Sequence, residues 1–346
     1  WIDPVYTDNA PLYVQRGKQK VRAINYGASE AKYQVRDVTI RSDHITGSGL
    51  KRFEYQQNPV STVWALREDG QIAKFVYESD QDVNCWTRFK TNGLVEDFAI
   101  IPSTKEYDEI YFIVNRSING VNKRFIEVLE PNFDLTFLNY NFLDSSLSYD
   151  GRQNTTLTLT TTTATAGSSV FSANSVGKQI NNINGDGRAK ITAYTNATTV
   201  SIEIIRDFTS INLTANNWAI ATNEVSGLTH LIGATVEVCG DQAVDLPVKV
   251  VDNTGKITLS SYYSIITVGL KYSSIFTSMP AESKKLLQAI GSQQNKYLRI
   301  TELAIKFFNS RGGQVSIDNN NQIIVARNAN DKWNQAPAPN TGIKKV

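Results

Sequence analysis

The fold class is decided by residues 60–77, which read VSTVWALREDGQIAKFVY. Two runs rich in β-branched and aromatic residues, Val60–Arg67 and Gln71–Tyr77, lie on either side of Asp69-Gly70. Asp-Gly tolerates the positive φ angles of a type I′ turn, whose twist suits a two-residue hairpin. The stretch therefore predicts two antiparallel strands.

The same pattern continues as far as residue 130. Asn92-Gly93 and Asn119-Gly120 supply two more turn signals of this kind. They separate four further β-rich runs, which are Val83–Phe89, Val95–Ile101, Glu109–Arg116 and Val121–Leu129. Turn signals at this spacing predict an antiparallel meander. Strands of this length are typical of propeller blades or of one layer of a sandwich.

Further strands are expected on both sides of the meander. Upstream they are Pro11–Val14, Lys20–Tyr26 and Ala31–Ile40, followed by a polar loop that carries His44. Downstream, Thr155–Thr165 holds eight threonines in eleven positions. Threonine favours strands, and its hydroxyl group suits an exposed face. This stretch therefore predicts a second small β domain.

Changes in residue composition and strand pattern along the chain predict three domains, at residues 1–150, 151–225 and 226–346. We expect an all-β fold that consists of a propeller-like hairpin body, an inserted Thr-rich β domain and a further sandwich or barrel-like block. In the third domain, Pro280–Ile290 carries the start and stop signals of a helix. Tyr297–Phe308 fits either a strand or a helix.

The composition is that of a folded chain without a general affinity for polyanions. Apolar residues make up 41% and charged residues 20%. Lys and Arg number 35 against 33 Asp and Glu, so the net charge of +2 gives no overall attraction to nucleic acid or anionic membrane. No apolar run is long enough to span a bilayer, and Cys85 and Cys239 are expected to be free thiols of a reducing compartment. The chain begins with Trp1, shows no signal peptide, and is expected to be a piece of a longer protein.

The residue types that catalysis needs do not form a recognisable constellation. His44 and His230 have no patterned Ser, Cys or carboxylate partner, and the cysteines and histidines lack the spacing of zinc ligands. Acidic residues form three adjacent pairs, Glu68-Asp69, Glu96-Asp97 and Asp108-Glu109. Neighbours on a strand point to opposite faces, which argues against a shared glycosidase site. Gly185-Asp186-Gly187 and Asp318–Asn321 lack the spaced ligands of a calcium loop. We therefore predict no catalytic, cofactor-binding or metal-binding residue, and no enzyme.

Two clusters combine aromatic and basic residues, Trp86–Lys90 and Lys306–Arg311. Stacking and positive charge together could bind bases or sugars. On strands, however, alternate aromatic residues more often line a core or a subunit contact. An exposed platform of Trp64, Trp86 and Trp218 would instead favour a carbohydrate-binding adhesin.

A series of ordered motifs carries a family resemblance. In chain order they are Val63–Gly70, Cys85–Phe89, Val95–Pro102, Asp108–Arg116, Arg124–Glu130, Leu143–Gly151, Leu228–Gly240, Val268–Tyr272 and Phe308–Gly313. Together they resemble the tail nozzle proteins of short-tailed (podovirus-like) bacteriophages, also called tail tubular protein B-like or stabilisation proteins. The resemblance runs in patches from about residue 35 to about residue 315.

The resemblance implies a virion protein of the phage tail, assembled in the cytoplasm of the bacterial host. It implies a propeller-like body and a ring, expected to be a homohexamer, at the distal end of the tail. The Thr-rich insert with Gly187–Ile205 resembles the FCCH-like domain named after ubiquitin-activating enzymes, a likeness of fold without ubiquitin chemistry. The implied partners are further copies of the chain, a tail adaptor protein, tail fibre proteins, and genomic DNA that passes through the lumen during ejection. The alternatives are the carbohydrate-binding adhesin and a glycan depolymerase with two carboxylates about 5–10 Å apart in one cleft.

Overall fold

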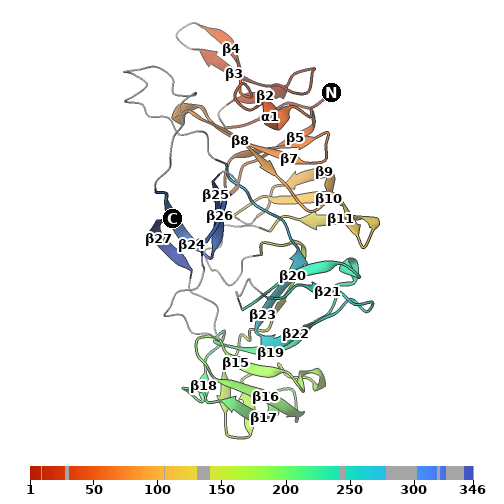
Figure 1. Ribbon diagram of the computed structural model, residues 1–346, viewed down its shortest axis with the longest axis vertical. Helices are drawn as coiled ribbons and strands as arrows, with labels where there is room; N and C mark the ends of the chain where they lie inside the picture. Colours follow the sequence, from red (N-terminus) through yellow and green to blue (C-terminus); the bar gives the residue numbers. More distant parts are fainter. Residues whose placement is uncertain are drawn as a thin grey trace. The chain divides into compact units, whose positions relative to one another are not determined.

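The computed structural model describes residues 1–8, 10–27, 31–104, 106–130, 141–241, 246–277, 302–317, 320–324 and 339–345. Of these described residues, strands make up 56% and helices 4%, which confirms the prediction of an all-β fold (Figure 1). The chain divides into two compact units, Trp1–Val238 with Pro247–Tyr272 and Cys239–Leu246 with Ser273–Val346. The predicted domain boundaries at residues 150 and 225 stay a prediction.

The strands predicted between residues 60 and 130 form two antiparallel sheets. The first has the order β5-β6-β7-β8, with strands Leu50–Gln56, Thr62–Arg67, Ile72–Glu78 and Val83–Phe89, and the 3-10 turn η1 (Ser79–Gln81) joins the last two. The second has the order β11-β10-β9, with strands Val121–Val128, Glu109–Ile118 and Leu94–Ile101. Within each sheet, neighbours in sequence are neighbours in space, as a meander requires.

The turn dipeptides differ in their geometry. At Asn119-Gly120 both residues have positive φ, 49° and 77°, as the type I′ prediction requires. At Asp69-Gly70 only Gly70 does (75°), and its N–H donates to the Arg67 carbonyl at 3.1 Å. This loop is therefore a three-residue turn that ends in a left-handed glycine, and the type I′ prediction for it is wrong.

The hairpin predicted at Asn92-Gly93 is also wrong, because β8 and β9 belong to different sheets. The Asn92 N–H donates to Asp144 Oδ2 (2.6 Å), and its carbonyl accepts from the Arg116 guanidinium. Strand β9 turns away to the Asp69-Gly70 loop, where the Val95 N–H donates to the Gly70 carbonyl at 2.8 Å. Polar partners far along the chain thus outweigh the local turn preference.

An amino-terminal sheet has the order β1-β2-β3-β4, with strands Val5–Tyr6, Pro11–Val14, Val21–Gly27 and Lys32–Asp37. The loop predicted around His44 contains instead the short helix α1 (Asp43–Thr46). Asp43 lies in its first turn, where a negative charge is favourable, and Ile45 and Thr46 are buried. Burial of these two side chains holds the turn in place.

Strand β6 is buried on both faces, and all six of its residues are buried. One face joins a core with the amino-terminal sheet, which includes Leu12, Val21, Ala23, Ala65, Phe75 and Trp86. The other face joins a core with the β9–β11 sheet, which includes Trp64, Leu66, Ile72, Phe98, Ile110 and Phe112. Each large side chain buried in this way stabilises the fold by about 1.5–3 kcal/mol. Burial on both faces explains why Thr62–Arg67 shows no alternation of apolar and polar residues.

Residues 144–270 contribute two more antiparallel sheets. One has the order β12-β23-β20-β21, with strands Asp144–Asp150, Ile265–Leu270, Thr235–Gly240 and Lys249–Val250. The other has the order β18-β13-β14-β17-β16-β15-β19-β22, with strands Asn212–Leu213, Leu157–Leu159, Thr163–Ala166, Thr199–Arg206, Arg188–Tyr194, Gln179–Asn182, Trp218–Val225 and Ile257–Tyr263. Two 3-10 turns, η3 (Ala173–Ser175) and η4 (Thr229–Leu231), lie in the connections. Leu157 and Leu159 are buried while Thr158 between them is exposed, so the Thr-rich stretch alternates as expected.

In the second unit, β24 (Ala304–Ser310) pairs with β27 (Asn340–Lys345), and β25 (Gly313–Ile317) pairs with β26 (Asn320–Ile324). The ambiguous segment Tyr297–Phe308 is a strand from Ala304 onward, and the predicted helix Pro280–Ile290 lies outside the described residues. No helix in the described part of the chain is long and apolar enough to cross a membrane.

Replacing Gly93 by alanine should destabilise the protein by about 2 kcal/mol or more. An alanine Cβ would lie 2.8 Å from the Asn115 carbonyl oxygen, and φ at this position is 152°. Gly120→Ala is the matched control, because φ is also positive (77°) but no atom lies within 4 Å of the added Cβ, so we expect about 1 kcal/mol. Urea unfolding followed by tryptophan fluorescence measures both losses, and equal values would contradict the crowding at Gly93.

Candidate functional site

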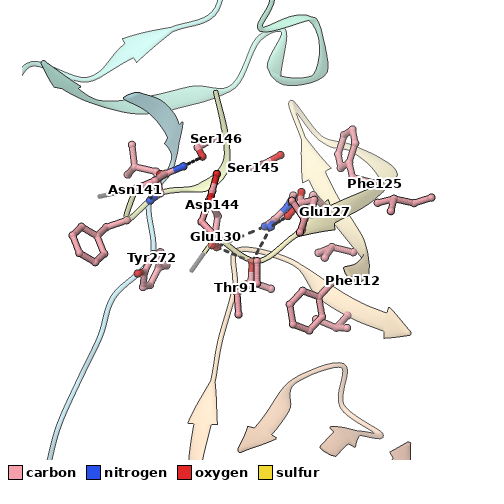
Figure 2. Close-up of a pocket in the computed structure, with 18 of the residues that line it drawn as sticks. Thr91, Phe112, Phe125, Glu127, Glu130, Asn141, Asp144, Ser145, Ser146 and Tyr272 are labelled. Carbon is pink, nitrogen blue, oxygen red and sulfur yellow. Dashed lines mark hydrogen bonds and ion pairs between the residues drawn. The ribbon is translucent and has the colours of Figure 1, made fainter. Parts of the chain in front are cut away.

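A cleft of about 540 Å³ lies between the β9–β11 sheet and the start of β12 (Figure 2). One wall is Phe125–Glu130 of β11 and the residues that follow it, and the other is Asn141–Ser146, which leads into β12. Phe112 of β10 lies on the apolar side, and Tyr272 lies at the opposite end. All of these residues belong to the first unit.

Arg116 is the centre of the polar side of the cleft and is only 1% exposed. Its guanidinium donates to both carboxylate oxygens of Glu127 (2.7 Å from Nε), to Thr91 Oγ1 (2.9 Å) and to the Asn92 carbonyl. Asp144 Oδ2 lies 3.7 Å from Nη1 and accepts from Thr91 Oγ1 (2.7 Å) and the Asn92 N–H. The network thus joins β10 and β11 to the beginning of β12.

This arrangement is better suited to holding β10, β11 and the start of β12 together than to proton transfer. A glycosidase needs one carboxyl group that can donate a proton to the leaving oxygen. Instead, both carboxylates neutralise the buried guanidinium of Arg116. Glu127 accepts its hydrogen bonds, and Asp144 lies beside it as a second anion. Buried ion pairs of this kind depend on having every partner present, because a lone charge left behind is costly.

The ends of the cleft add apolar and aromatic contacts. Burial raises the pKa of the Tyr272 phenol, and the negative charge of Asp144 adds a smaller increase. His230 Nε2 lies 2.9 Å from the Ser145 carbonyl oxygen, and its ring meets that of Phe125 edge-on at 6.3 Å. The histidine therefore links η4 to both walls of the cleft.

The histidines considered from the sequence lie apart in the fold. His44 lies in α1, where its carbonyl accepts from Arg88, and His230 lies in η4 beside the cleft. Cys85 and Cys239 do not form a disulfide bond. Within the ranges that the structure describes, no three His, Cys, Asp or Glu side chains gather as they would around a metal ion.

The adjacent acidic pairs are all held by other groups. Glu68 pairs with Lys18 (2.7 Å) and Asp69 with Arg67 (2.8 Å), while Glu96 pairs with Arg124 (2.7 Å) and Asp97 with Arg52 (2.9 Å). Asp108 accepts from the backbone N–H groups of Gln57 and Asn58, and Glu109 accepts from the Tyr111 hydroxyl. Hydrogen bonds from Arg124 and Asn115 hold the pKa of Glu96 below its usual range. Of Gly185-Asp186-Gly187, Asp186 lies 3.9 Å from Arg206, and Asp318 and Asn319 lie outside the described residues.

The aromatic residues of Trp86–Lys90 line cores. Trp86 stacks on Phe75 at 4.3 Å and its indole N–H donates to the Val38 carbonyl, whereas Phe89 packs on the opposite face against Trp64. In the other cluster Phe308 remains exposed on β24. Trp64, Trp86 and Trp218 are all buried, so the expectation of an exposed carbohydrate platform built from them is wrong.

The sequence reading missed Arg116, although one signal for it was present. In Glu109–Ile118 the apolar residues at every second position are buried, and Arg116 occupies a position in the same series. A charge on the apolar face of a strand requires buried partners. The partners themselves, Glu127 and Asp144, carry no such signal.

No family model matches the chain, and no curated protein matches it.

Lys74 on β7 is a further charge in an apolar setting. Its ammonium lies 4.4 Å from the centre of the Trp64 ring and makes no ion pair within the described residues. Burial lowers the pKa of Lys74. Desolvation of this charge costs free energy, and the cation–π contact with Trp64 offsets part of that cost.

Arg116→Met should lower the unfolding free energy by about 3–5 kcal/mol, because it leaves Glu127 and Asp144 without their buried counter-ion. The control is Lys18→Met, which removes an exposed ion pair with Glu68 and should cost less than about 1 kcal/mol. Guanidinium chloride unfolding of both variants measures the difference. Similar small losses in the two would show that the Arg116 network does not hold the fold.

Lys74→Met should raise the unfolding free energy by about 1 kcal/mol at neutral pH. Because the folded pKa lies below the unfolded value of 10.5, the amine is charged in both states at low pH, and the cost of burial is then complete. That cost disappears as the pH rises through the folded pKa towards 10.5. The difference in unfolding free energy between variant and wild type should therefore become smaller. Unfolding curves at several pH values test this, with Lys190→Met, at an exposed position of β16, as the control. A gap that does not change with pH would contradict it.

Proposed function

We propose that this chain is a structural subunit of the nozzle ring at the distal end of a short phage tail, and that it acts by assembly. The observation that carries the proposal is the ordered set of motifs from Val63–Gly70 to Phe308–Gly313. Most of these motifs fall on strands, and the first five fall on the two meander sheets.

The packing of the meander supports this proposal. Two consecutive four-stranded antiparallel sheets, β1–β4 and β5–β8, pack through one shared core, and the β5–β8 sheet packs on the β9–β11 sheet through another. Successive small antiparallel sheets stacked face to face are the way in which propeller blades are built. A body of this kind suits a structural protein that acts by packing against neighbouring subunits.

Open sheet edges with apolar side chains support assembly. Edge strand β4 exposes Tyr33 (74%) and Val35 (51%), and edge strand β11 exposes Ile126 (78%) and Val128 (50%). Edges of this kind are prone to aggregation unless another chain or element covers them. In a ring, a neighbouring subunit would cover them.

The finer parts of the proposal follow from the resemblance. The ring would hold six copies, bind a tail adaptor and tail fibres, and let DNA pass. A net charge of +2 suits a lumen that must release DNA, because each phosphate neutralised by Lys or Arg adds affinity. The chemistry would then be contact between subunits, with no catalytic group involved.

The purified chain should form a closed ring with contacts of about 2,000 Å² or more between neighbours, because obligate interfaces reach that size. Light scattering after gel filtration gives the mass, and negative-stain electron microscopy gives the symmetry. A chain that stays monomeric at high concentration would contradict the proposal. Incubation with host-cell polysaccharide is the parallel arm, and release of reducing sugar ends would favour the depolymerase instead.

A further inference from the structure

We infer that neighbouring copies join by strand addition, with β11 of one copy pairing antiparallel to β4 of the next. This inference rests on the proposed function for the identity of the neighbour, which is a second copy of the chain. It names the strands and the register of the contact.

The hydrogen-bond register shows which backbone groups of β11 are free. The Leu129 N–H donates to the Ile110 carbonyl (2.9 Å), and Ile118 faces Val121 across the two-residue turn. In an antiparallel ladder, bonded pairs recur at every second residue, so odd-numbered residues of β11 bond to β10. Arg124, Ile126 and Val128 therefore direct their N–H and C=O groups outward, away from the sheet. Within the described residues, no backbone partner meets these groups.

The same reasoning applies to β4. The Val38 N–H donates to the Val21 carbonyl (3.1 Å), so even-numbered residues of β4 bond to β3. Tyr33, Val35 and Asp37 direct their backbone groups outward. Each edge thus presents three alternate residues whose backbone groups point outward and whose side chains lie on one face of the strand.

One antiparallel register fits the two edges to each other. It places Val128 opposite Tyr33, Ile126 opposite Val35 and Arg124 opposite Asp37. Two exposed apolar pairs are thereby covered, and opposite charges meet at the end of the ladder. The last pair extends ion pairs that each side chain already makes, Arg124 with Glu96 and Asp37 with Lys20.

The residues between these pairs also match. Arg36 falls opposite Phe125, where its guanidinium can lie over the ring. Arg36 is exposed and makes no ion pair in the described part of the chain, so it is available for this contact. Shifting the register by two residues in either direction loses the pairing of Arg124 with Asp37.

The opposite edge of the β9–β11 sheet is not available for strand addition. The β9 N–H groups of Val95, Phe98 and Ile100 already donate to the Gly70 carbonyl, Asp97 Oδ1 and Glu54 Oε2. The pairing of β11 with β4 joins two different surfaces, so it is heterologous. Repeated contacts of this type close into a ring when the rotation between copies allows it.

Charge placement tests the register. Ile126→Asp and Val35→Lys each put a charge opposite an apolar residue, and each alone should weaken assembly at least about 100-fold. The double variant carries both substitutions, so the introduced carboxylate of one copy faces the introduced ammonium of the next, and assembly should be restored. Ile205→Asp is the matched control, since this isoleucine is also exposed but lies on β17, in a different sheet from either of the two pairing strands. It should assemble like the wild type.

The full chain is used throughout, with sedimentation velocity over a concentration series as the measure of assembly. Circular dichroism and the melting temperature establish that each variant is folded. Loss in both single variants with recovery in the double variant supports the inference. Unchanged assembly in either single variant, or no recovery in a folded double variant, overturns the pairing while the ring proposal stands. A wild-type chain that remains monomeric overturns both.

Discussion

The guanidinium of Arg116 is the constraint on which the middle of the molecule depends. It sits on the apolar face of β10, where a charge is tolerated only with partners on every side. Those partners come from three places in the sequence: Thr91 and Asn92 after β8, Glu127 on β11, and Asp144 at the start of β12. One side chain thus determines where β9 begins, how β11 lies and how the chain enters the following sheet.

Much of the fold could be predicted because local chemistry and tertiary structure agree. Asn119-Gly120 makes the turn that its residues favour, and the strands around it alternate between buried and exposed side chains. The same dipeptide at Asn92-Gly93 does not, because Asp144 and Arg116 capture the polar groups of Asn92. The local turn preference contributes less free energy than hydrogen bonds to charged side chains far away in the chain. No local sequence pattern reveals those residues.

The candidate site shows the same limit more strongly. Arg116 carried a signal, its place in the buried series of Glu109–Ile118, but nothing in the sequence pointed to Asp144 as its neighbour. Acidic residues that stood out by adjacency, such as Glu96-Asp97, proved to be partners of Arg124 and Arg52 on the surface. Tryptophan also misleads when its side of a strand is unknown. Trp64 and Trp86 face opposite cores of one sheet, a fact that depends on having a further sheet on each side.

The burial of β6 on both faces has a consequence for synthesis of the chain. The β5–β8 sheet packs against another sheet on each face of β6, so the side that carries Trp64, Leu66 and Ile72 stays exposed to solvent until β9 and β10 have been synthesised. A nascent chain that ends before residue 94, where β9 begins, therefore exposes a continuous apolar surface in a sheet whose own hydrogen bonds are already complete. This region is where we expect the growing polypeptide to need protection from its neighbours, and where a fragment cut between the sheets would be insoluble.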